Sequence, residues 1–440
     1  MQGQIQFNIE DFKAVKKAEI LLDGITVVAG VNASGKSTIS KLIYDSYQIS
    51  AHFDEILERR LTSRLRKVTR FLDIIMSEIN SVSTNRNSLE EMHSMRDITK
   101  RFKHLKEEDL KSWLDFIDNV ENNYLSQPKF QNSFNQEIKK NRHDRLEFMI
   151  RDINNEKGIL KINEDKPFSA VADYVKKIYE EAMQNLRDRP MSIFRSELTN
   201  IYSHEVPHKF EVSEIGNVIT SFSQTRFGLS YLIEESIYID SPSIFNNRFY
   251  LPPVNRYLEK VRDLLSNKSP ISTFIDTGLI SKVIGGDIDS ESQLVDFTYK
   301  RDDGSNFDLI DCATGIKSFA ILQILLKNGH INDRTLVVID EPELNLHPQW
   351  IVEYARVIVL LNKLIGVRFF IASHNPDMVS AIKHIYEKEN TAKGLNFYIA
   401  KKENKDAYQY IYEKCGTDIE PIFQSFNIAF DRINFYSGDE

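Results

Sequence analysis

The sequence predicts an α/β protein in which a mixed or parallel sheet core is interrupted by an inserted helical domain. Two compact apolar runs, GITVVAG at 24–30 and TLVVID at 335–340, are typical of strands buried on both faces of a sheet. Over residues 308–374, helical patterns alternate with such strands, which indicates parallel strand pairing. Over residues 51–205, apolar residues recur at three- and four-residue spacing with charges between them, as in amphipathic helices.

These changes of pattern predict four segments. Residues 1–50 form the N-terminal part of the α/β head, and residues 51–205 form the helical insertion, a short coiled-coil-like domain rather than a long rod. Residues 206–383 complete the head, and residues 384–440 form a C-terminal α/β extension with two further strands. We interpret the insertion as a scaffold or dimerisation element, with a surface that contacts a partner or nucleic acid as the alternative.

Composition limits the class of protein. Of 440 residues, 41% are hydrophobic and 27% are charged, which excludes collagen-like, disulfide-scaffold and largely disordered chains. A formal charge of -8 argues against extensive coating of nucleic acid but leaves room for a local basic patch. The two cysteines cannot form a disulfide framework. No signal peptide or bilayer-spanning segment is evident, so we expect a cytoplasmic protein without membrane contact.

A phosphate-binding loop follows the first buried strand. Residues 30–37, GVNASGKS, match G-x-x-x-x-G-K-[ST] and precede a helical pattern, which is the context this motif requires. Its glycines permit close backbone approach, and successive N–H groups at a helix N-terminus surround phosphate oxygens. Lys36 would reach the β- and γ-phosphates of a nucleoside triphosphate, and Ser37 would bind Mg²⁺. The candidate nucleotide contacts are Gly30, Asn32, Ala33, Ser34, Gly35, Lys36, Ser37 and Thr38.

A second buried strand ends in two carboxylates, Asp340 and Glu341. Ligands bind at the carboxyl ends of strands in open α/β sheets, so this pair would face the phosphate loop. Asp340 would hold Mg²⁺ directly or through water, and Glu341 would orient or deprotonate the attacking water. The alternative is that the pair only caps a helix, since Pro342 suits a helix start.

The phosphate loop and the acidic strand resemble motifs of the ABC-type ATPase family. ATGIKS lies upstream of the acidic strand and IASH lies downstream of it, in the order that this family has. The opening IEDFKAVKKAEILLDGITVVAGVNASGKST and the segment DEPELNLHP are similar to its RecF, SMC and OLD-like branch, whose members include ATPases of bacterial anti-phage defence. The resemblance covers roughly residues 1–50 and 300–380 and not the helical insertion. It implies an ABC-type head that binds ATP with Mg²⁺.

The resemblance also implies roles for further residues. Residues 312–318, CATGIKS, stand where the family has its signature motif, which caps the γ-phosphate held by a second protomer, so Thr314, Gly315 and Lys317 become candidate nucleotide contacts. Ala313 stands where a serine is usual, which predicts slow turnover. His374 resembles the histidine that senses the γ-phosphate, and it joins Glu341 and Lys36 as a candidate catalytic residue.

Other positions stay open at this stage. A helix start that packs in the core is the alternative for residues 312–318. Arg256 resembles a recurring Pro-and-Arg segment, with nucleotide sensing and packing equally open, and no Q-loop glutamine can be assigned.

Three functions are consistent with these motifs. The first is an ATPase that forms a homodimer or higher oligomer through its ATP sites and controls a separately encoded effector, most plausibly a nuclease, as in the Septu (PtuA-like), PARIS and retron-associated defence systems. The second is a RecF-like ATPase of DNA repair or maintenance that binds DNA directly. The third is a non-hydrolysing scaffold clamped by ATP. No nuclease motif is recognisable in the chain itself, and the basic residues that favour DNA binding are Arg59, Arg60, Arg64, Arg66, Lys67 and Arg70.

Overall fold

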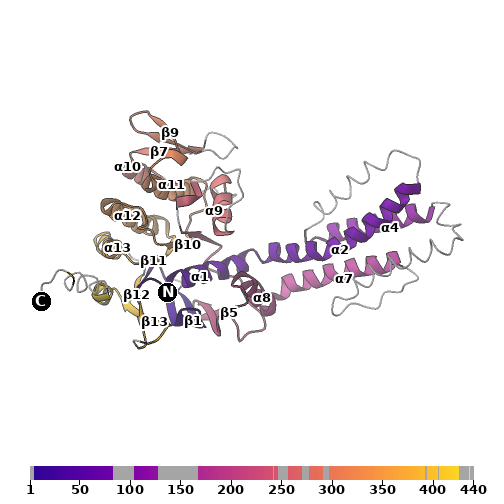
Figure 1. The fold of residues 1–440 in the computed structure, drawn as a ribbon, viewed down its shortest axis with the longest axis horizontal. Coiled ribbons are helices and arrows are strands. Elements are labelled where there is room, and N and C mark those ends of the chain that lie inside the picture. The colour runs from indigo at the N-terminus through magenta and orange to yellow at the C-terminus, as the bar shows by residue number, and fades with distance from the viewer. Residues whose placement is uncertain are drawn as a thin grey trace. The chain divides into compact units, whose positions relative to one another are not determined.

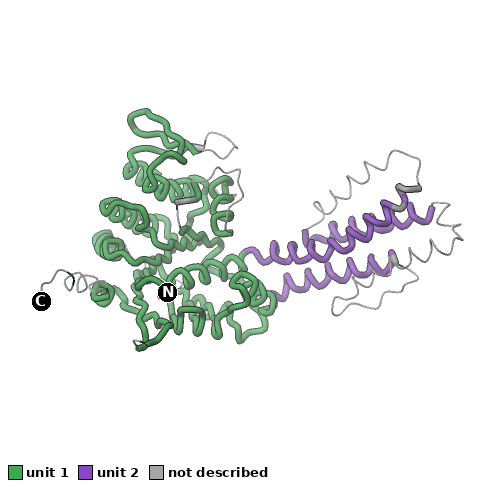
Figure 2. Tube along the Cα trace, viewed as in Figure 1, with its two compact units in different colours: residues 1–51, 191–440 green, residues 52–190 purple. Residues whose placement is uncertain are grey.

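The computed structural model describes two compact units (Figure 2). Residues 1–51 and 191–440 make up unit 1, and residues 52–190 make up unit 2. The described residues are 4–82, 104–126, 167–240, 242–245, 256–269, 277–290, 297–391, 394–404, 406–425 and 436. Part of the predicted insertion and the segment FYLPPVN at 249–255 lie outside these ranges.

Unit 1 contains a ten-stranded sheet with the order β5-β4-β1-β2-β13-β12-β3-β11-β10-β6 among the described residues. Figure 1 labels β1, β5 and β10 to β13 of this sheet. From β12 to β6 the neighbouring strands are parallel, and β1 pairs antiparallel with both β2 and β4. The α/β class and the mixed sheet are therefore confirmed. The strands are β1 (Ile5–Phe12), β2 (Val15–Leu22), β3 (Ile25–Ala29), β4 (Lys209–Glu214), β5 (Asn217–Ser221), β6 (Glu235–Ile239), β10 (Thr335–Asp340), β11 (Arg368–Ser373), β12 (Leu395–Lys402) and β13 (Tyr410–Gly416).

Helices cover this sheet. Alternate residues of β3, β10 and β11 pack in one apolar cluster with α11, α12 and α13, while α1 packs on β6, β10 and β11 and contributes no residue to that cluster. Alternation along a strand places such residues on opposite faces, so the parallel strands are buried on both sides. The helices of unit 1 with described bounds include α1 (Lys36–Ala51), α8 (Met191–Ile201), α9 (Arg256–Ser266), α10 (Gly278–Ile284), α11 (Thr314–Lys327), α12 (Pro348–Ile365) and α13 (Pro376–Lys388).

A smaller antiparallel sheet also belongs to unit 1. Its order is β7 (Gly286–Ser290), β8 (Phe297–Arg301) and β9 (Asn306–Asp308), and short 3-10 helices occupy Pro242–Phe245 and Leu309–Asp311. Gln323 of α11 accepts a hydrogen bond from the N–H of Ile288 in β7. This buried contact joins the small sheet to the helix that carries residues 314–317.

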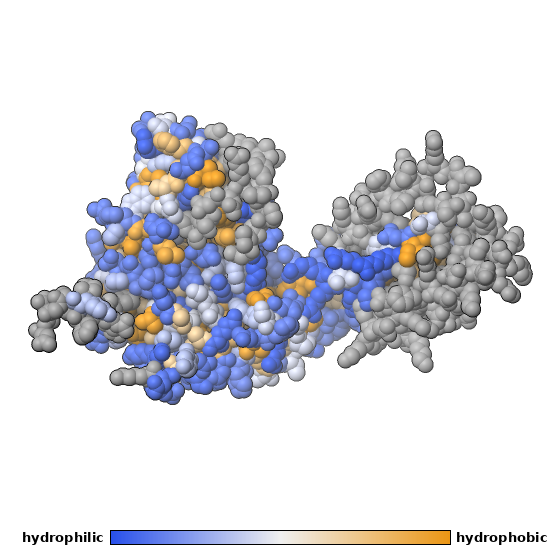
Figure 3. All heavy atoms as spheres, viewed as in Figure 1, coloured by the Kyte–Doolittle hydropathy of each residue, from blue (hydrophilic) through white to orange (hydrophobic). Residues whose placement is uncertain are grey.

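Unit 2 consists, in its described part, of α2 (Phe53–Val82), α4 (Glu107–Ser126) and α7 (Pro167–Asp188). Their apolar faces meet in one cluster that includes Phe71, Trp113 and Tyr174. The described side chains on the face shown in Figure 3 are mainly hydrophilic, as expected for amphipathic helices that bury one stripe.

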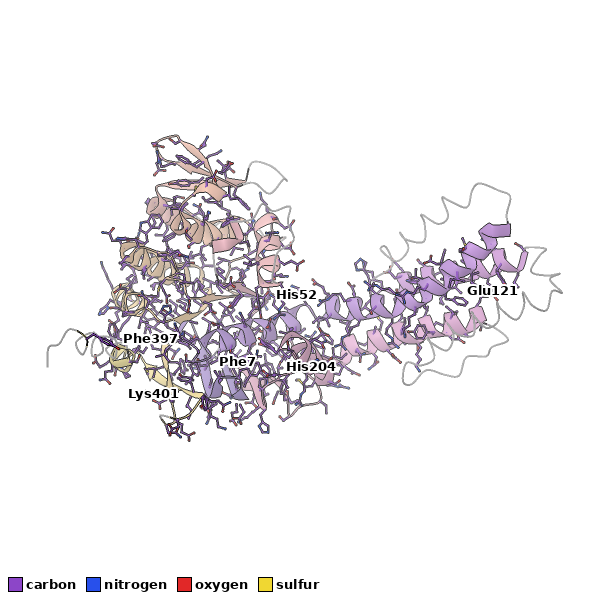
Figure 4. The ribbon with its side chains drawn as sticks, in the orientation of Figure 1. Phe7, His52, Glu121, His204, Phe397 and Lys401 are labelled. Atoms are coloured by element: carbon purple, nitrogen blue, oxygen red, sulfur yellow. The ribbon has the colours of Figure 1, made fainter. Side chains whose placement is uncertain are left out.

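Two boundaries differ from the sequence prediction. The helical unit ends at Pro190 and not at 205, because α8 packs within unit 1, where Phe194 contacts the rings of Phe210 and Phe227. The C-terminal segment is not a separate extension, because β12 and β13 are inserted between β3 and β2 of the main sheet. Figure 4 labels Phe7 of β1 and Phe397 of β12, both of which are fully buried.

None of the helices in the described ranges is long and apolar enough to cross a membrane.

Candidate functional site

At two positions of the loop between β3 and α1, only glycine fits. A Cβ on Gly30 would lie 2.7 Å from the Cβ of Ala400, and one on Gly35, whose φ is +94°, would lie 2.9 Å from a methyl carbon of Val15. Strand β13 supports the same loop, because the hydroxyl of Tyr412 donates to the carbonyl of Ser34 at 3.1 Å. The C-terminal strands thus help to shape the loop.

Lys36, the first residue of α1, turns back over the loop. Its Nζ donates to the carbonyl oxygens of Gly30 and Val31 at 2.8 and 3.2 Å, and the residue is only 5% exposed. Burial lowers the pKa of Lys36, and the nearby carboxylates of Glu341, Asp340 and Glu343 oppose that shift. A cation held over a loop of backbone N–H groups is suited to bind an anionic phosphate chain.

The other predicted contacts of the loop differ in exposure. Asn32, Ala33 and Ser37 are exposed, and Thr38 is partly buried. Ser34 is 1% exposed, and its Oγ has no well-aligned hydrogen-bond partner within the described part of the chain. A buried hydroxyl without a well-aligned partner is costly, so this hydroxyl remains available to a ligand oxygen.

Asp340 ends β10 beside this loop and is 7% exposed. The hydroxyl of Tyr238 donates to its Oδ2 at 3.0 Å, while Oδ1 is buried and has no well-aligned partner among the described residues. Burial raises the pKa of Asp340, and the hydroxyls of Ser37 and Tyr238 act in the opposite direction. A nearby Ser hydroxyl and a carboxylate oxygen with no well-aligned partner match the oxygen ligands that Mg²⁺ prefers.

Glu341, His374 and Glu343 form a second group at this edge of the sheet. The Nδ1 atom of His374 lies 3.3 Å from an oxygen of Glu341 and 3.3 Å from one of Glu343. Glu341 has a left-handed backbone with φ of +53°, and its N–H donates to the carbonyl of Ala372 in β11. This hydrogen bond and the left-handed backbone direct Glu341 out of the strand and toward His374.

Glu343 fixes the backbone at His374. One oxygen of its buried carboxylate accepts from the hydroxyl of Ser373 at 2.9 Å and from the N–H of His374 at 3.0 Å. Burial raises the pKa of Glu343 despite these hydrogen bonds. Glu343 was not singled out in the sequence, although it is the third carboxylate of DEPE and that repetition could have indicated it.

Residues 314–317 begin α11, whose N-terminus has no side-chain cap at Ala313. Thr314 is partly buried, and the Nζ of Lys317 donates to the carbonyl of Ile310 at 2.7 Å. One turn further, Ser318 lines a small pocket together with Asp340 and Glu341. The structure therefore brings α11 to the acidic strand, while its first turn presents backbone N–H groups that no side chain of Ala313 can satisfy.

Gly315 packs directly against Trp350 of α12. A Cβ there would lie 2.7 Å from the ring carbon Cε3, so Gly315→Ala is expected to lower the free energy of unfolding by about 1–3 kcal/mol through overpacking. Chemical denaturation measures this loss. In a Trp350→Leu background the same change should cost much less, and strict additivity of the two changes would contradict the packing account.

Arg256 contacts α1 and not the phosphate loop. Its Nη2 lies 2.6 Å from Oδ2 of Asp45, which also accepts from Tyr202 at 2.7 Å and from Tyr257 at 3.3 Å. Burial raises the pKa of Asp45, and the charge of Arg256 lowers it. The structure thus favours packing over nucleotide sensing for Arg256.

Replacement of Arg256 should destabilise unit 1 in a pH-dependent way. Arg256→Met leaves a buried carboxylate without its cation, for an expected loss of about 1–2 kcal/mol at pH 8, reduced from the buried-pair range because the arginine is partly exposed. The pKa of Asp45 then rises further, so the native state holds a proton that the unfolded state releases, and the loss shrinks as the pH falls toward 5. Denaturation at several pH values measures this. Arg356→Met, at an exposed pair with Glu353, should show a smaller and flatter effect, and equal profiles would contradict the account.

Tyr238 was also missed in the sequence. It is 2% exposed in β6, and both burial and the charge of Asp340 raise its pKa, so its hydroxyl keeps the proton that it donates. No local signal could have indicated this role, because it depends on β6 lying beside β10.

The loop after β3 and the carboxylates at the end of β10 have the residue pattern of a P-loop ATPase site. A family model described as "AAA domain, putative AbiEii toxin, Type IV TA system" matches residues 25–380. This match covers most of the chain, and the chain belongs to that family. The ATPase resemblance predicted from the motifs is therefore confirmed.

Individual proteins are similar over less of their length or at low identity. A 96-residue segment of this chain is 31% identical to the Old nuclease of Escherichia phage P2. The segment makes up 22% of this chain and only 16% of that relative. The SMC head domain from Thermotoga maritima is 10% identical with a TM-score of 0.35, over 94% of this chain and 99% of that one. The cbiO1 structure from Clostridium perfringens is 11% identical with a TM-score of 0.26, over 55% and 82%. The class of this chain rests on the family match and not on these two structures.

Proposed function

We propose that this protein binds ATP with Mg²⁺ and hydrolyses it. The observation that carries the proposal is the convergence of Lys36, Asp340 and the Glu341–His374 pair at the carboxyl ends of β3, β10 and β11. These strands are adjacent and parallel, and such an edge is where α/β sheets bind ligands.

Each group has a distinct role in this proposal. The loop N–H groups and Lys36 bind the phosphates, with Gly30 to Thr38 as the contact segment. Asp340 and Ser37 would hold Mg²⁺, which when bound neutralises charge on the phosphates. Glu341 accepts a proton from the attacking water or orients it, and His374, 3.3 Å away, senses or contacts the γ-phosphate.

A second copy of the chain would complete the site. In this proposal Thr314, Gly315 and Lys317 of one protomer face the nucleotide of its partner. The first turn of the 14-residue helix α11 supports this, because its N–H groups have no cap from Ala313 and a helix N-terminus favours anions. The missing serine hydroxyl at position 313 is consistent with slow turnover.

The cellular role we propose is control of a separately encoded effector, a nuclease, in anti-phage defence. The family description, a putative toxin of a type IV toxin–antitoxin system, and the partial similarity to the Old nuclease support this role. Direct action on DNA is the second candidate. DNA binding would require free cations on the helical insertion. Arg64 is not free, because it pairs with Glu181 at 2.8 Å and lies over the ring of Tyr174.

Two assays test the proposal. The purified chain should bind ATP and release phosphate only when Mg²⁺ is present, and no binding at millimolar ATP would overturn it. Sizing of the complex from its own operon, with and without ATP, should show a co-purifying neighbour-encoded protein. A lone ATP-dependent dimer whose DNA affinity falls steeply with salt would favour the DNA-binding candidate instead.

A further inference from the structure

The hydroxyl of Tyr238 occupies one oxygen of Asp340, the carboxylate that ends β10. None of the roles proposed above uses this contact. The hydroxyl donates to Oδ2 of Asp340 at 3.0 Å, and an ionised carboxylate can only accept, so the direction of this bond is fixed. With Oδ2 engaged, the buried Oδ1 is the oxygen left without a well-aligned partner in the described ranges.

Strand register explains why these two side chains meet. In the parallel pair of β6 and β10, Tyr238 lies beside Val338, and Asp340 is two residues further along β10. Side chains alternate across a sheet, so residues 338 and 340 lie on the same face. The tyrosine therefore reaches the carboxylate from the neighbouring strand, at the end where the phosphate loop lies.

The ring of Tyr238 is held in place by its neighbours. It lies 4.8 Å from the ring of Tyr257 and 5.8 Å from that of Tyr44, measured between centroids, and Lys41 Nζ lies 5.9 Å from its centroid. The residue is 2% exposed. A ring packed in this way has little rotational freedom, so its hydroxyl is a fixed donor and not one that samples several positions.

We propose that Tyr238 is a positioning residue for the metal of the ATP site: it locks the rotamer of Asp340 so that Oδ1 is presented to Mg²⁺. The inference rests on the proposed function, since it concerns the metal that accompanies ATP. Hydrogen bonds to a ligating carboxylate fix its orientation, and loss of such a partner costs about 10–100-fold in metal affinity or activity.

The test compares Tyr238→Phe with Tyr44→Phe, each in the full chain. Both changes remove one hydroxyl from the same aromatic cluster, but only Tyr238 donates to Asp340. Manganese serves as the probe, because the electron paramagnetic resonance signal of free Mn²⁺ reports its binding directly. Both variants are made in a Glu341→Gln background, so that turnover does not obscure the titration, and are titrated at equal concentrations of protein and ATP. A parallel titration of ATP alone is subtracted, because ATP binds Mn²⁺ in solution.

We expect Tyr238→Phe to weaken Mn²⁺ binding by about 10-fold while ATP binding in EDTA stays as in the background protein, and Tyr44→Phe to leave both unchanged. Equal Mn²⁺ affinity in all three proteins would overturn the inference, as would equal weakening by both tyrosine changes. Absence of ATP binding in the background protein itself would instead overturn the proposed function, which separates the two failures. Circular dichroism melting in EDTA confirms that each variant is folded.

Discussion

Glu341→Gln should reduce phosphate release by about 10²–10⁴-fold, because an amide cannot accept the proton of the attacking water. The change keeps the size of the side chain and its left-handed backbone position after β10. ATP binding should persist, and an ATP-bound assembly should accumulate because the nucleotide is not consumed. Phosphate release under single-turnover conditions, beside a filter-binding measurement of ATP, separates the two effects.

The matched control is Glu353→Gln in α12, whose carboxylate pairs with Arg356 on the surface. It removes the same charge from the same unit and should leave turnover near that of the unchanged protein. Loss of ATP binding in Glu341→Gln would mean that this residue holds the nucleotide and does not act on water. Unchanged turnover would assign the proton transfer to another group, with Glu343, which also lies 3.3 Å from Nδ1 of His374, as the candidate.

Lys36→Ala should weaken ATP binding by about 30–150-fold. The lysine is the first residue of α1, and its buried ammonium group donates to the carbonyls of Gly30 and Val31. Loss of a charge-assisted hydrogen bond to phosphate removes about 2–3 kcal/mol, a factor of 30–150 in affinity. Isothermal titration with ATP measures the change.

Lys383→Ala provides the control for Lys36→Ala. It removes a lysine from α13 that pairs with Glu387 away from the loop, and it should bind ATP as the unchanged protein does. Circular dichroism melting of Lys36→Ala without ATP checks that the variant is folded. Normal ATP affinity in Lys36→Ala would contradict the claim that this loop binds the phosphates of ATP.

The parts of the fold that were predicted from sequence are local. The phosphate loop needs only a buried strand, eight residues and a helix start, and the acidic strand needs only an apolar run with two carboxylates at its end. Both motifs therefore stand in the structure where the sequence placed them, at β3–α1 and after β10. His374 was assigned from its place in the motif order, and the structure puts it 3.3 Å from Glu341.

The parts that sequence could not give depend on contacts between distant segments. The insertion of β12 and β13 between β3 and β2 pairs residue 395 with residue 25, and neither strand carries a signal of its partner. The pattern of α8 is amphipathic like that of the insertion, so its membership of unit 1 depends on ring contacts with Phe210 and Phe227. Tyr238 acts on Asp340 through strand register, which no spacing along the chain encodes.

The central claim is that Lys36, Asp340, Glu341 and His374 form one site for Mg²⁺-dependent ATP hydrolysis. Its most direct test is phosphate release by the purified full chain over a wide range of protein concentration, with Mg²⁺ and with EDTA. The account predicts release that requires Mg²⁺ and a specific activity that rises with protein concentration, as a site completed by a second copy demands. The same rate with and without Mg²⁺, or no release at any concentration while ATP is bound, would contradict it.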